Sequence, residues 1–430
     1  MGIRTYLHRA TTACVWVRGG HYHPLDWVGE RFQLYRWWAN STRLPLAEQQ
    51  FAVLPSRGVL EVSGPECTNF LQGLVSNDVR LVQEEKRPIF AAMSNPQGRF
   101  LYDLLIHPHP SNTDAVFLDV DRAAVDPLLA TLRRFKLRAK VKIDDVSDTK
   151  RVAVQFHYRG TVPSSAPPRG AIPHCVEDDT QARKSSSSSS SSSFSPILKH
   201  VDPRLRALGL RGVIDSGATD TMEARAAETY QCLRASLGIP EGLEEISSGE
   251  GIPLEFNLDG LNGVSYTKGC YVGQELTART HYRGVVRKRL MPVLFRCDPS
   301  ECTSAITPGA KITISSKEES GESGSRGGGI SLGRVAMVCS HASGHVDDTV
   351  GTPQLVRQGL ALLRLEHALP RALRQDVAGD VHRVITSLYG VSTDHGPPMM
   401  ISGTGVSVQP ILPFWWPQEW GPVALGQQQQ

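Results

Sequence analysis

Residues 267–290 read TKGCYVGQELTARTHYRGVVRKRL and separate two regions of different character. Before this stretch, helical and strand patterns alternate. After it, short β segments with glycine-rich connectors follow one another. Four or five such strands over this length are typical of a small barrel. We therefore expect a mixed α+β region followed by a C-terminal β-barrel.

The region before this stretch has the element order β-α-β-β-β-α-β. This order implies an α+β fold with antiparallel sheets. Apolar periodicity and turn residues predict a strand near 59–62, a helix over 66–79, a hairpin over 87–109, a strand over 114–120, a helix running into a strand over 122–146, a strand over 205–215 and a helix over 220–240.

Segments of biased composition set the expected domain boundaries. Nine serines in a row, with prolines before them, cannot bury apolar surface and predict a disordered insert. The expected organisation is a transit peptide and tether at 1–50, an α+β region of two subdomains at 51–158 plus 201–286, a disordered insert at 159–200, a barrel at 287–418 with an insert at 371–403, and a disordered tail at 419–430.

The first 25 residues carry Arg4, Arg9 and Arg18 and no acidic residue. Apolar residues among them fall on one helical face. A basic, acid-poor amphipathic start is typical of an organelle transit peptide. We expect the mitochondrial matrix rather than the plastid stroma, which is the alternative, because serine is scarce here. An ordinary disordered terminus is the remaining interpretation.

Composition narrows the class of protein. A formal net charge of +3 over 430 residues excludes a general polyanion-binding argument. The eight cysteines are scattered without a C-x-x-C pair, which argues against a zinc ribbon, a ferredoxin-type cluster site and a disulfide scaffold. No apolar run is long enough to predict a membrane-spanning helix.

Cys270 is the first candidate functional residue. A thiol near Lys268 and the arginines downstream can have a lowered pKa and be a thiolate near neutral pH. Glycines at 269 and 273 let the backbone approach a ligand closely. The alternative is a small buried apolar residue, as many cysteines without a disulfide are.

Three polar residues upstream have two interpretations each. Glu255, in an otherwise apolar stretch, could pair with a ring that offers adjacent N–H donors, or could be a cap or surface acid. Asp103, on a predicted strand, could face a pocket or the solvent. Asn77 could be part of a site or only end a turn.

A basic cluster follows Cys270. It could contact phosphate, a polyglutamate tail or an acidic partner, or it could be a solvated face. No aromatic platform alternates with it, which disfavours single-stranded nucleic acid. The cluster consists of Arg279, His281, Arg283, Arg287, Lys288 and Arg289.

The stretch YTKGCYVGQELTARTHYRGVVRKRL at 266–290 resembles the signature of mitochondrial iron–sulfur cluster assembly factors related to the glycine-cleavage T protein, an aminomethyltransferase. Its K-G-C-Y-x-G-Q-E block carries the resemblance most specifically. Supporting segments extend over about 51–415, with gaps at the serine run and at 371–403; they are RGVLEVSGPECTNFLQGLVSNDV, QGRFLYDLLI, PLEFNLDGLNGVS, GLALLRLEHAL and PFWWPQEW.

The resemblance implies a three-domain, aminomethyltransferase-like ring with antiparallel sheets and a small C-terminal β-barrel. It also implies a central cavity that accepts tetrahydrofolate in relatives. The expected role is maturation of [4Fe–4S] client apoproteins with A-type iron–sulfur carriers. No stably bound metal or cluster, no direct nucleic acid and no membrane contact are expected.

The resemblance also assigns residues. Cys270, with Lys268, is expected to carry the chemistry, whether redox, transient cluster contact or repair of an intermediate. Glu255 falls where relatives contact the pterin, and Asp103 falls near the catalytic acid of the aminomethyltransferases, where this chain has Tyr102 before it. The expected folate-binding set is Glu255, Asp103, Asn77, Tyr271, Gln274, Glu275 and Arg283.

Two other functions remain open at this stage. The first is a folate-dependent aminomethyl or methyl transferase, which would depend on Asp103 more than on Cys270. The second is an RNA-binding protein linked to tRNA modification, which would show a steep salt dependence of RNA binding. An assembly factor without classical turnover is the expectation that we carry forward.

Overall fold

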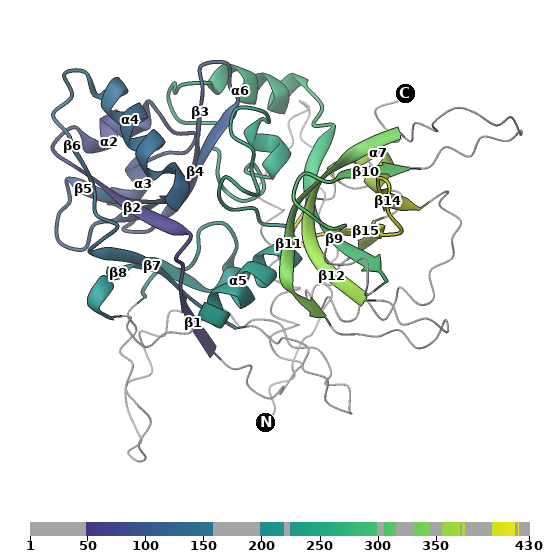
Figure 1. The fold of residues 1–430 in the computed structure, drawn as a ribbon. Helices are drawn as coiled ribbons and strands as arrows, with labels where there is room; N and C mark the ends of the chain where they lie inside the picture. Colours follow the sequence, from purple (N-terminus) through teal and green to yellow (C-terminus); the bar gives the residue numbers. More distant parts are fainter. Residues whose placement is uncertain are drawn as a thin grey trace, which may run out of the picture. The chain divides into compact units, whose positions relative to one another are not determined.

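The computed structural model describes residues 49–157, 198–218, 224–298, 305–314, 330–343, 355–369, 372–374, 398–417 and 420. These residues belong to one compact unit, Ala47–Gln430. They build three sheets, of five, three and seven strands (Figure 1). Most of the expected transit peptide and tether (1–50), of the disordered insert (159–200) and of the disordered tail (419–430) lies outside the described residues.

The five-stranded sheet is antiparallel, with strand order β3-β4-β5-β2-β6. Successive side chains on a strand point to opposite faces of the sheet, and here both faces are buried. Leu104 belongs to the hydrophobic cluster shared with the helices, whereas the next residue, Leu105, belongs to the large central cluster. The strands are β2 (Arg57–Ser63), β3 (Ile89–Ser94), β4 (Phe100–Pro108), β5 (Ala115–Asp121) and β6 (Lys142–Asp145).

Helix α4 (Val125–Lys136) shows why the helices lie on this sheet. Val125, Leu128 and Leu132 recur at helical spacing and are all buried. Asp126 lies in the first turn and basic residues lie in the last, which suits the helix dipole. The other helical elements around this sheet are α2 (Cys67–Gln72), α3 (Arg80–Glu84) and the 3-10 turn η1 (Arg122–Ala124).

The three-stranded sheet has the antiparallel order β1-β7-β8. Helix α5 (Ala224–Leu237) contacts β1 and also contacts barrel strands β9, β11 and β12, so it joins this sheet to the barrel. The strands are β1 (Gln49–Val53), β7 (Lys150–His157) and β8 (Leu210–Asp215), followed or preceded by the short turns η2 (Arg206–Leu208) and η3 (Ser216–Ala218).

The third sheet closes on itself. Its strands follow the order β13-β15-β14-β10-β11-β12-β9, and an additional pairing of β15 with β9 closes six of them into a barrel. The elements are β9 (Lys288–Cys297), β10 (Lys311–Ile314), β11 (Ile330–Ser343), β12 (Leu355–Arg364), α7 (Leu365–Ala368), β13 (Leu373–Arg374), β14 (Met399–Ile401) and β15 (Ser407–Leu412). The α+β class with antiparallel sheets and a small C-terminal barrel is confirmed.

Several expected elements have different limits. The helix predicted over 66–79 ends at Gln72, where Gly73 follows, and a second helix, α3, begins only at Arg80. The stretch 371–403 is not wholly an insert, because β13 and β14 lie within it and pair with barrel strands. Leu198, expected in the disordered insert, is buried and packs with Ala153.

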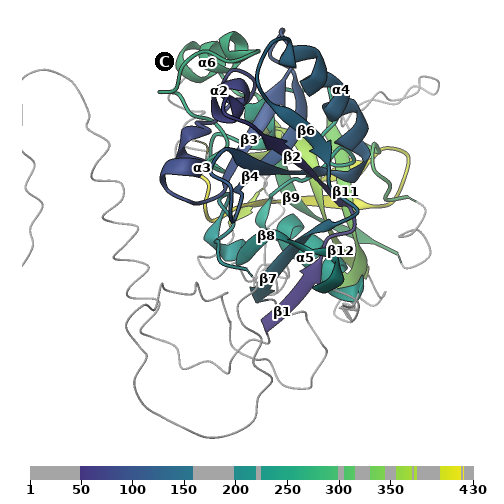
Figure 2. The same cartoon turned by 90° about the vertical axis from the view of Figure 1, so that its left-hand side faces the viewer.

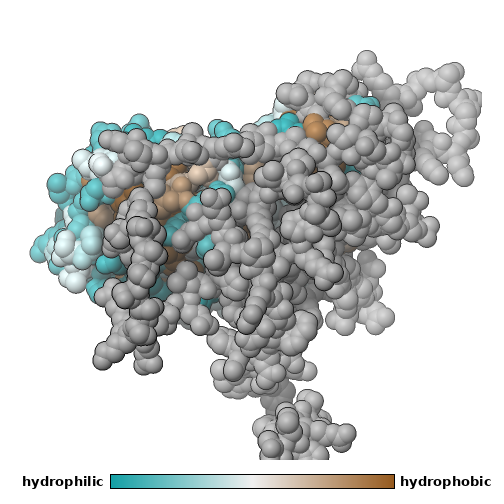
Figure 3. All heavy atoms as spheres, turned by 90° about the horizontal axis from the view of Figure 1, so that it is seen from below, coloured by the Kyte–Doolittle hydropathy of each residue, from teal (hydrophilic) through white to brown (hydrophobic). Residues whose placement is uncertain are grey.

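The surface of the described part is mixed in polarity. Seen from below, hydrophobic atoms lie beside hydrophilic ones where described residues are visible (Figure 3). Across the described ranges, no helix combines the length and apolarity needed to span a membrane. Within the same ranges, no group of three or more His, Cys, Asp and Glu residues is placed to hold a metal ion.

Candidate functional site

The signature loop, residues 262–273, lies against the end of α2. Two backbone hydrogen bonds fix it there. Ser265 N donates to Ser76 O at 2.9 Å, and Val272 N donates to Gly73 O at 3.0 Å. Helix α6 (Gln274–Arg283) continues the loop and lies near the top of the molecule in Figures 1 and 2. The loop therefore has a defined backbone despite its polar sequence.

Lys268 is the main side-chain anchor of this loop. It is buried, and its ammonium donates to Gln72 O at 2.6 Å, Val75 O at 2.7 Å and Asn77 O at 3.0 Å. Burial lowers the pKa of Lys268 to about 8. An ammonium has three N–H donors, so these carbonyls use them all. Lys268 therefore positions the loop, and its expected part in the chemistry of Cys270 stays a prediction.

Asn77 ties the same two segments together. Its Nδ2 donates to Asn262 O at 2.8 Å and to Phe90 O at 2.7 Å. Its Oδ1 accepts from Asp78 N at 2.9 Å. The side chain is nearly buried, and its polar atoms are committed to the protein. Asn77 thus lies in the candidate site as a structural residue.

Cys270 lies at the open side of the loop. It is exposed, whereas the four other cysteines of the described part are buried. A Cβ added at the preceding Gly269 would meet nothing within 4 Å, so the space beside the backbone is also open there. The four buried cysteines are Cys67, Cys232, Cys297 and Cys339. An accessible thiol on a fixed backbone can serve as a soft ligand or as a nucleophile.

The loop passes into α6 through Gly273. Its φ of +82° favours glycine, and a Cβ there would lie 2.5 Å from Asn95 O in the β3–β4 turn. Gln274 Oε1 accepts from Tyr271 N at 3.1 Å, which closes the start of the helix. The Lys268 ammonium lies 4.9 Å from the Tyr271 ring centroid, within cation–π range. Burial raises the pKa of Tyr271.

Glu275 and Arg283 lie on the solvent side of α6. The Glu275 side chain is 91% exposed, and Arg279 Nη1 lies 3.8 Å from its Oε1. Arg283, in the last turn of the helix, is also exposed. These two residues therefore belong to a surface rather than to an enclosed pocket.

Glu255 lies in a separate turn, η4 (Pro253–Phe256). Its carboxylate accepts a long hydrogen bond from Ile252 N at 3.3 Å, which caps the turn. Arg289 holds the same turn through a hydrogen bond from Nη1 to Leu254 O at 2.8 Å. Glu255 is half-buried, and this one hydrogen bond leaves acceptor capacity on its carboxylate.

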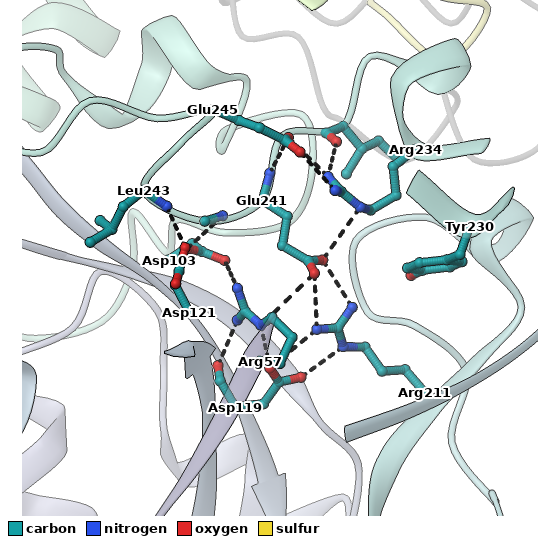
Figure 4. Close-up of polar contacts among 12 residues, drawn as sticks. Arg57, Asp103, Asp119, Asp121, Arg211, Tyr230, Arg234, Glu241, Leu243 and Glu245 are labelled. Carbon is teal, nitrogen blue, oxygen red and sulfur yellow. Dashed lines mark hydrogen bonds and ion pairs between the residues drawn. The ribbon is translucent and has the colours of Figure 1, made fainter. Parts of the chain in front are cut away.

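Asp103 lies in the interior, in a network of charged side chains shown in Figure 4. Arg57 Nη1 donates to its Oδ2 at 2.8 Å, and Gly242 N donates to its Oδ1 at 3.1 Å. It does not face the solvent, which was one of the two interpretations from the sequence. Each of its oxygens already accepts one hydrogen bond.

The network extends across all parts of the α+β region. Arg57 of β2 also donates to Asp119 of β5 at 2.7 Å, and Arg211 of β8 donates to Asp119 at 2.7 Å and to Glu241 at 2.9 Å. A second layer surrounds these residues and includes Asp202, Arg204, Tyr230, Arg234 and Glu245. These residues join both smaller sheets and α5 through buried charge pairs.

Burial and pairing oppose each other in this network. Burial alone raises the pKa of Glu241, but Arg211, Arg234 and Arg204 outweigh it and hold the pKa well below its ordinary value. The pKa of Asp119 is lowered in the same way, by Arg211 and Arg57 against burial. Glu245 differs, because burial outweighs its pairing with Arg234 and raises its pKa.

The residues proposed from the sequence thus fall into four groups. Asn77, Lys268, Tyr271 and Gln274 come together around the loop that presents Cys270. Glu275 and Arg283 lie on the outer face of α6, Glu255 in η4, and Asp103 in the ion network. Sequence reasoning missed the network partners. The available signal was an acid in an apolar strand, such as Asp119 in AVFLDVD.

Comparison of the sequence with known proteins shows which proteins this chain is similar to. No family model matches the sequence. A protein of Mycosarcoma maydis is 38% identical over 57% of each chain, and one of Aspergillus clavatus is 31% identical over 85% of this chain and 81% of its own. The human protein is 35% identical over 63% of this chain and 72% of its own. All three are named as mitochondrial iron–sulfur cluster assembly factors.

The chain belongs to the IBA57 family of these assembly factors. This confirms the resemblance expected from the sequence and the mitochondrial location. A solved structure of the glycine cleavage system aminomethyltransferase T from Bartonella henselae matches with a TM-score of 0.49 and 12% identity, over 86% of this chain and 87% of that chain.

Proposed function

We propose that this protein acts in mitochondrial iron–sulfur cluster assembly, in the matrix, and that it serves the maturation of [4Fe–4S] proteins together with A-type carriers. One observation carries the proposal. Cys270 is exposed, and the loop that presents it is held by the buried ammonium of Lys268. A fixed, accessible thiol is suited to brief contact with a cluster or with a cluster-carrying partner.

The roles of the chain's own residues follow from their contacts. Lys268 and Asn77 hold the loop on the end of α2. Gly273 and Gln274 set the entry into α6. Cys270 supplies the sulfur ligand, and the cluster is cargo that passes on to client apoproteins.

Tetrahydrofolate fits only part of the expected residue set. Glu255 fits, because its half-buried carboxylate has acceptor capacity left for the adjacent N–H groups of a pterin. Asn77 and Asp103 do not fit, since their polar atoms are bonded within the protein. Calorimetric titration with tetrahydrofolate tests this: binding by wild type and loss in Glu255→Gln would support it, whereas equal binding by both would refute the assignment.

The interior position of Asp103 weighs against the transferase alternative. A general acid or base must reach the reacting group of its substrate. Asp103 instead pairs with Arg57 and is 1% exposed. For the RNA-linked alternative, the exposed basic residues of α6 are the relevant feature, and they are considered below.

Cells depleted of this protein provide the test. We would measure aconitase, a [4Fe–4S] enzyme, beside a [2Fe–2S] protein, and attempt rescue with wild type, Cys270→Ala and Thr267→Ala. Thr267 is an exposed neighbour in the same loop and serves as the matched control. Rescue of aconitase by wild type and Thr267→Ala but not by Cys270→Ala is expected. Normal aconitase in depleted cells would refute the assembly role.

A further inference from the structure

Helix α6 leaves one face without a described neighbour. Its inner side is packed: Thr277 is 1% exposed, and the Cβ that Gly98 lacks would lie 2.5 Å from Leu276 Cβ. Positions 275, 279, 282 and 283 share the opposite side, because residues three and four apart are neighbours on a helix. All four of these side chains are exposed.

This outer face combines positive charge with apolar contact area. Between 275 and 288, four basic residues stand against Glu275 alone. Tyr282 is 67% exposed, and Val285, just beyond the helix, is 54% exposed. In the described part of the chain, four large hydrophobic side chains are more than half exposed, and two of them, Tyr282 and Val285, lie three residues apart. Their clustering at one end of one helix distinguishes this face from scattered surface residues.

An aromatic stack holds the exposed tyrosine in place. The rings of Tyr266 and His281 lie 3.7 Å apart at 15°, and Tyr282 meets both rings edge-on. Partial burial lowers the pKa of His281 and so disfavours its charged form, and the arginines supply the positive charge of the face. Rigid Tyr and Arg side chains are the residue types that most often dominate binding at protein interfaces.

We propose that the outer face of α6, with Arg279, Tyr282, Arg283 and Val285, is the docking surface for an acidic face of the cluster-carrying protein that Cys270 serves. Charge complementarity selects an acidic partner. The exposed Val285 favours a protein over nucleic acid, because an aliphatic side chain gains nothing from a phosphate backbone. This inference rests on the proposed function and adds the surface by which the partner is recognised.

The test is the affinity of purified, full-length protein for a purified mitochondrial A-type carrier loaded with its cluster. The variant is Arg279→Glu with Arg283→Glu. The control is Arg133→Glu with Arg134→Glu, the same charge change on two exposed arginines of α4. We expect Kd to rise about tenfold or more for the α6 variant and less than about twofold for the control. The double glutamine variant should give an intermediate loss, and guards against a folding defect in the reversal.

Unchanged affinity of the α6 variant would overturn the docking surface, and so would absence of carrier binding by wild type. If the α6 variant loses binding to a uridine-rich RNA probe but still binds the carrier, the face binds nucleic acid instead. The rescue experiment separates the two proposals. If the α6 variant restores aconitase while Cys270→Ala does not, docking at α6 is wrong and the assembly role stands; if wild type fails to restore it, the assembly role itself is wrong.

Discussion

Replacing Lys268 by Met would test whether this residue is an anchor. The change removes three donors from Gln72 O, Val75 O and Asn77 O, at distances of 2.6, 2.7 and 3.0 Å. An acceptor that loses its partner in a buried place costs about 1 kcal/mol or more. Three of them give about 3 kcal/mol, from which relief of the buried ammonium subtracts some. We expect a loss of about 2–3 kcal/mol in the free energy of unfolding.

Equilibrium unfolding in urea, followed by tryptophan fluorescence, measures this loss. Lys142→Met is the matched control, because the side chain of Lys142 is 77% exposed and its partner is Asp144, at 2.8 Å. The control should be as stable as wild type. If Lys268→Met is also as stable as wild type, the three carbonyls have other partners and Lys268 must be reconsidered as a chemical rather than a positioning residue.

Three further predictions concern the ion network and the loop. Arg211→Met leaves Asp119 and Glu241 short of a buried cation and should cost about 3–5 kcal/mol in urea unfolding; a loss below about 1 kcal/mol would contradict the network. In the folded protein, the pKa values of Asp119 and Glu241 lie below their ordinary values of 3.8 and 4.5. The stability that these two carboxylates contribute is therefore complete above the ordinary values and is lost as the pH falls below them. In thermal unfolding between pH 7 and 3, Tm should fall below about pH 4.5, and a Tm that does not change with pH would contradict the lowered pKa values. Gly273→Ala, with φ at +82° and a Cβ 2.5 Å from a backbone oxygen, should lower stability by about 2 kcal/mol or more, whereas Gly269→Ala, which meets open space, should change it by less than about 0.5 kcal/mol; equal effects would show that the loop adjusts.

Local patterns in the sequence were enough to predict the class of fold. Apolar spacing located α4 and α5, and glycine-separated β segments predicted the barrel. The limits of elements were harder, because they depend on tertiary contacts. Gly73 ends α2 where the signature loop attaches, and β14 is only three residues long and is held by pairing with β10 and β15.

The candidate site was predictable where residues are close in sequence. Cys270, Tyr271 and Gln274 share one loop and helix start. The role of Lys268 was not predictable, because its partners lie more than 190 residues earlier. The same holds for Asp103, whose partner Arg57 comes from another strand. A charged residue in a strand signals that a partner exists, but only the fold identifies it.

The closure of the barrel has a consequence for how the chain is made. Strand β9 begins at Lys288, soon after α6 ends, and its partner β15 ends only at Leu412. Contacts between residues so distant in sequence form late and slowly. Until the last strand has been delivered, β9 and β14 each present an unpaired edge, which can join with other chains. Chains that lack β15 are therefore expected to aggregate before they can function, and a nascent chain needs protection until β15 has been made.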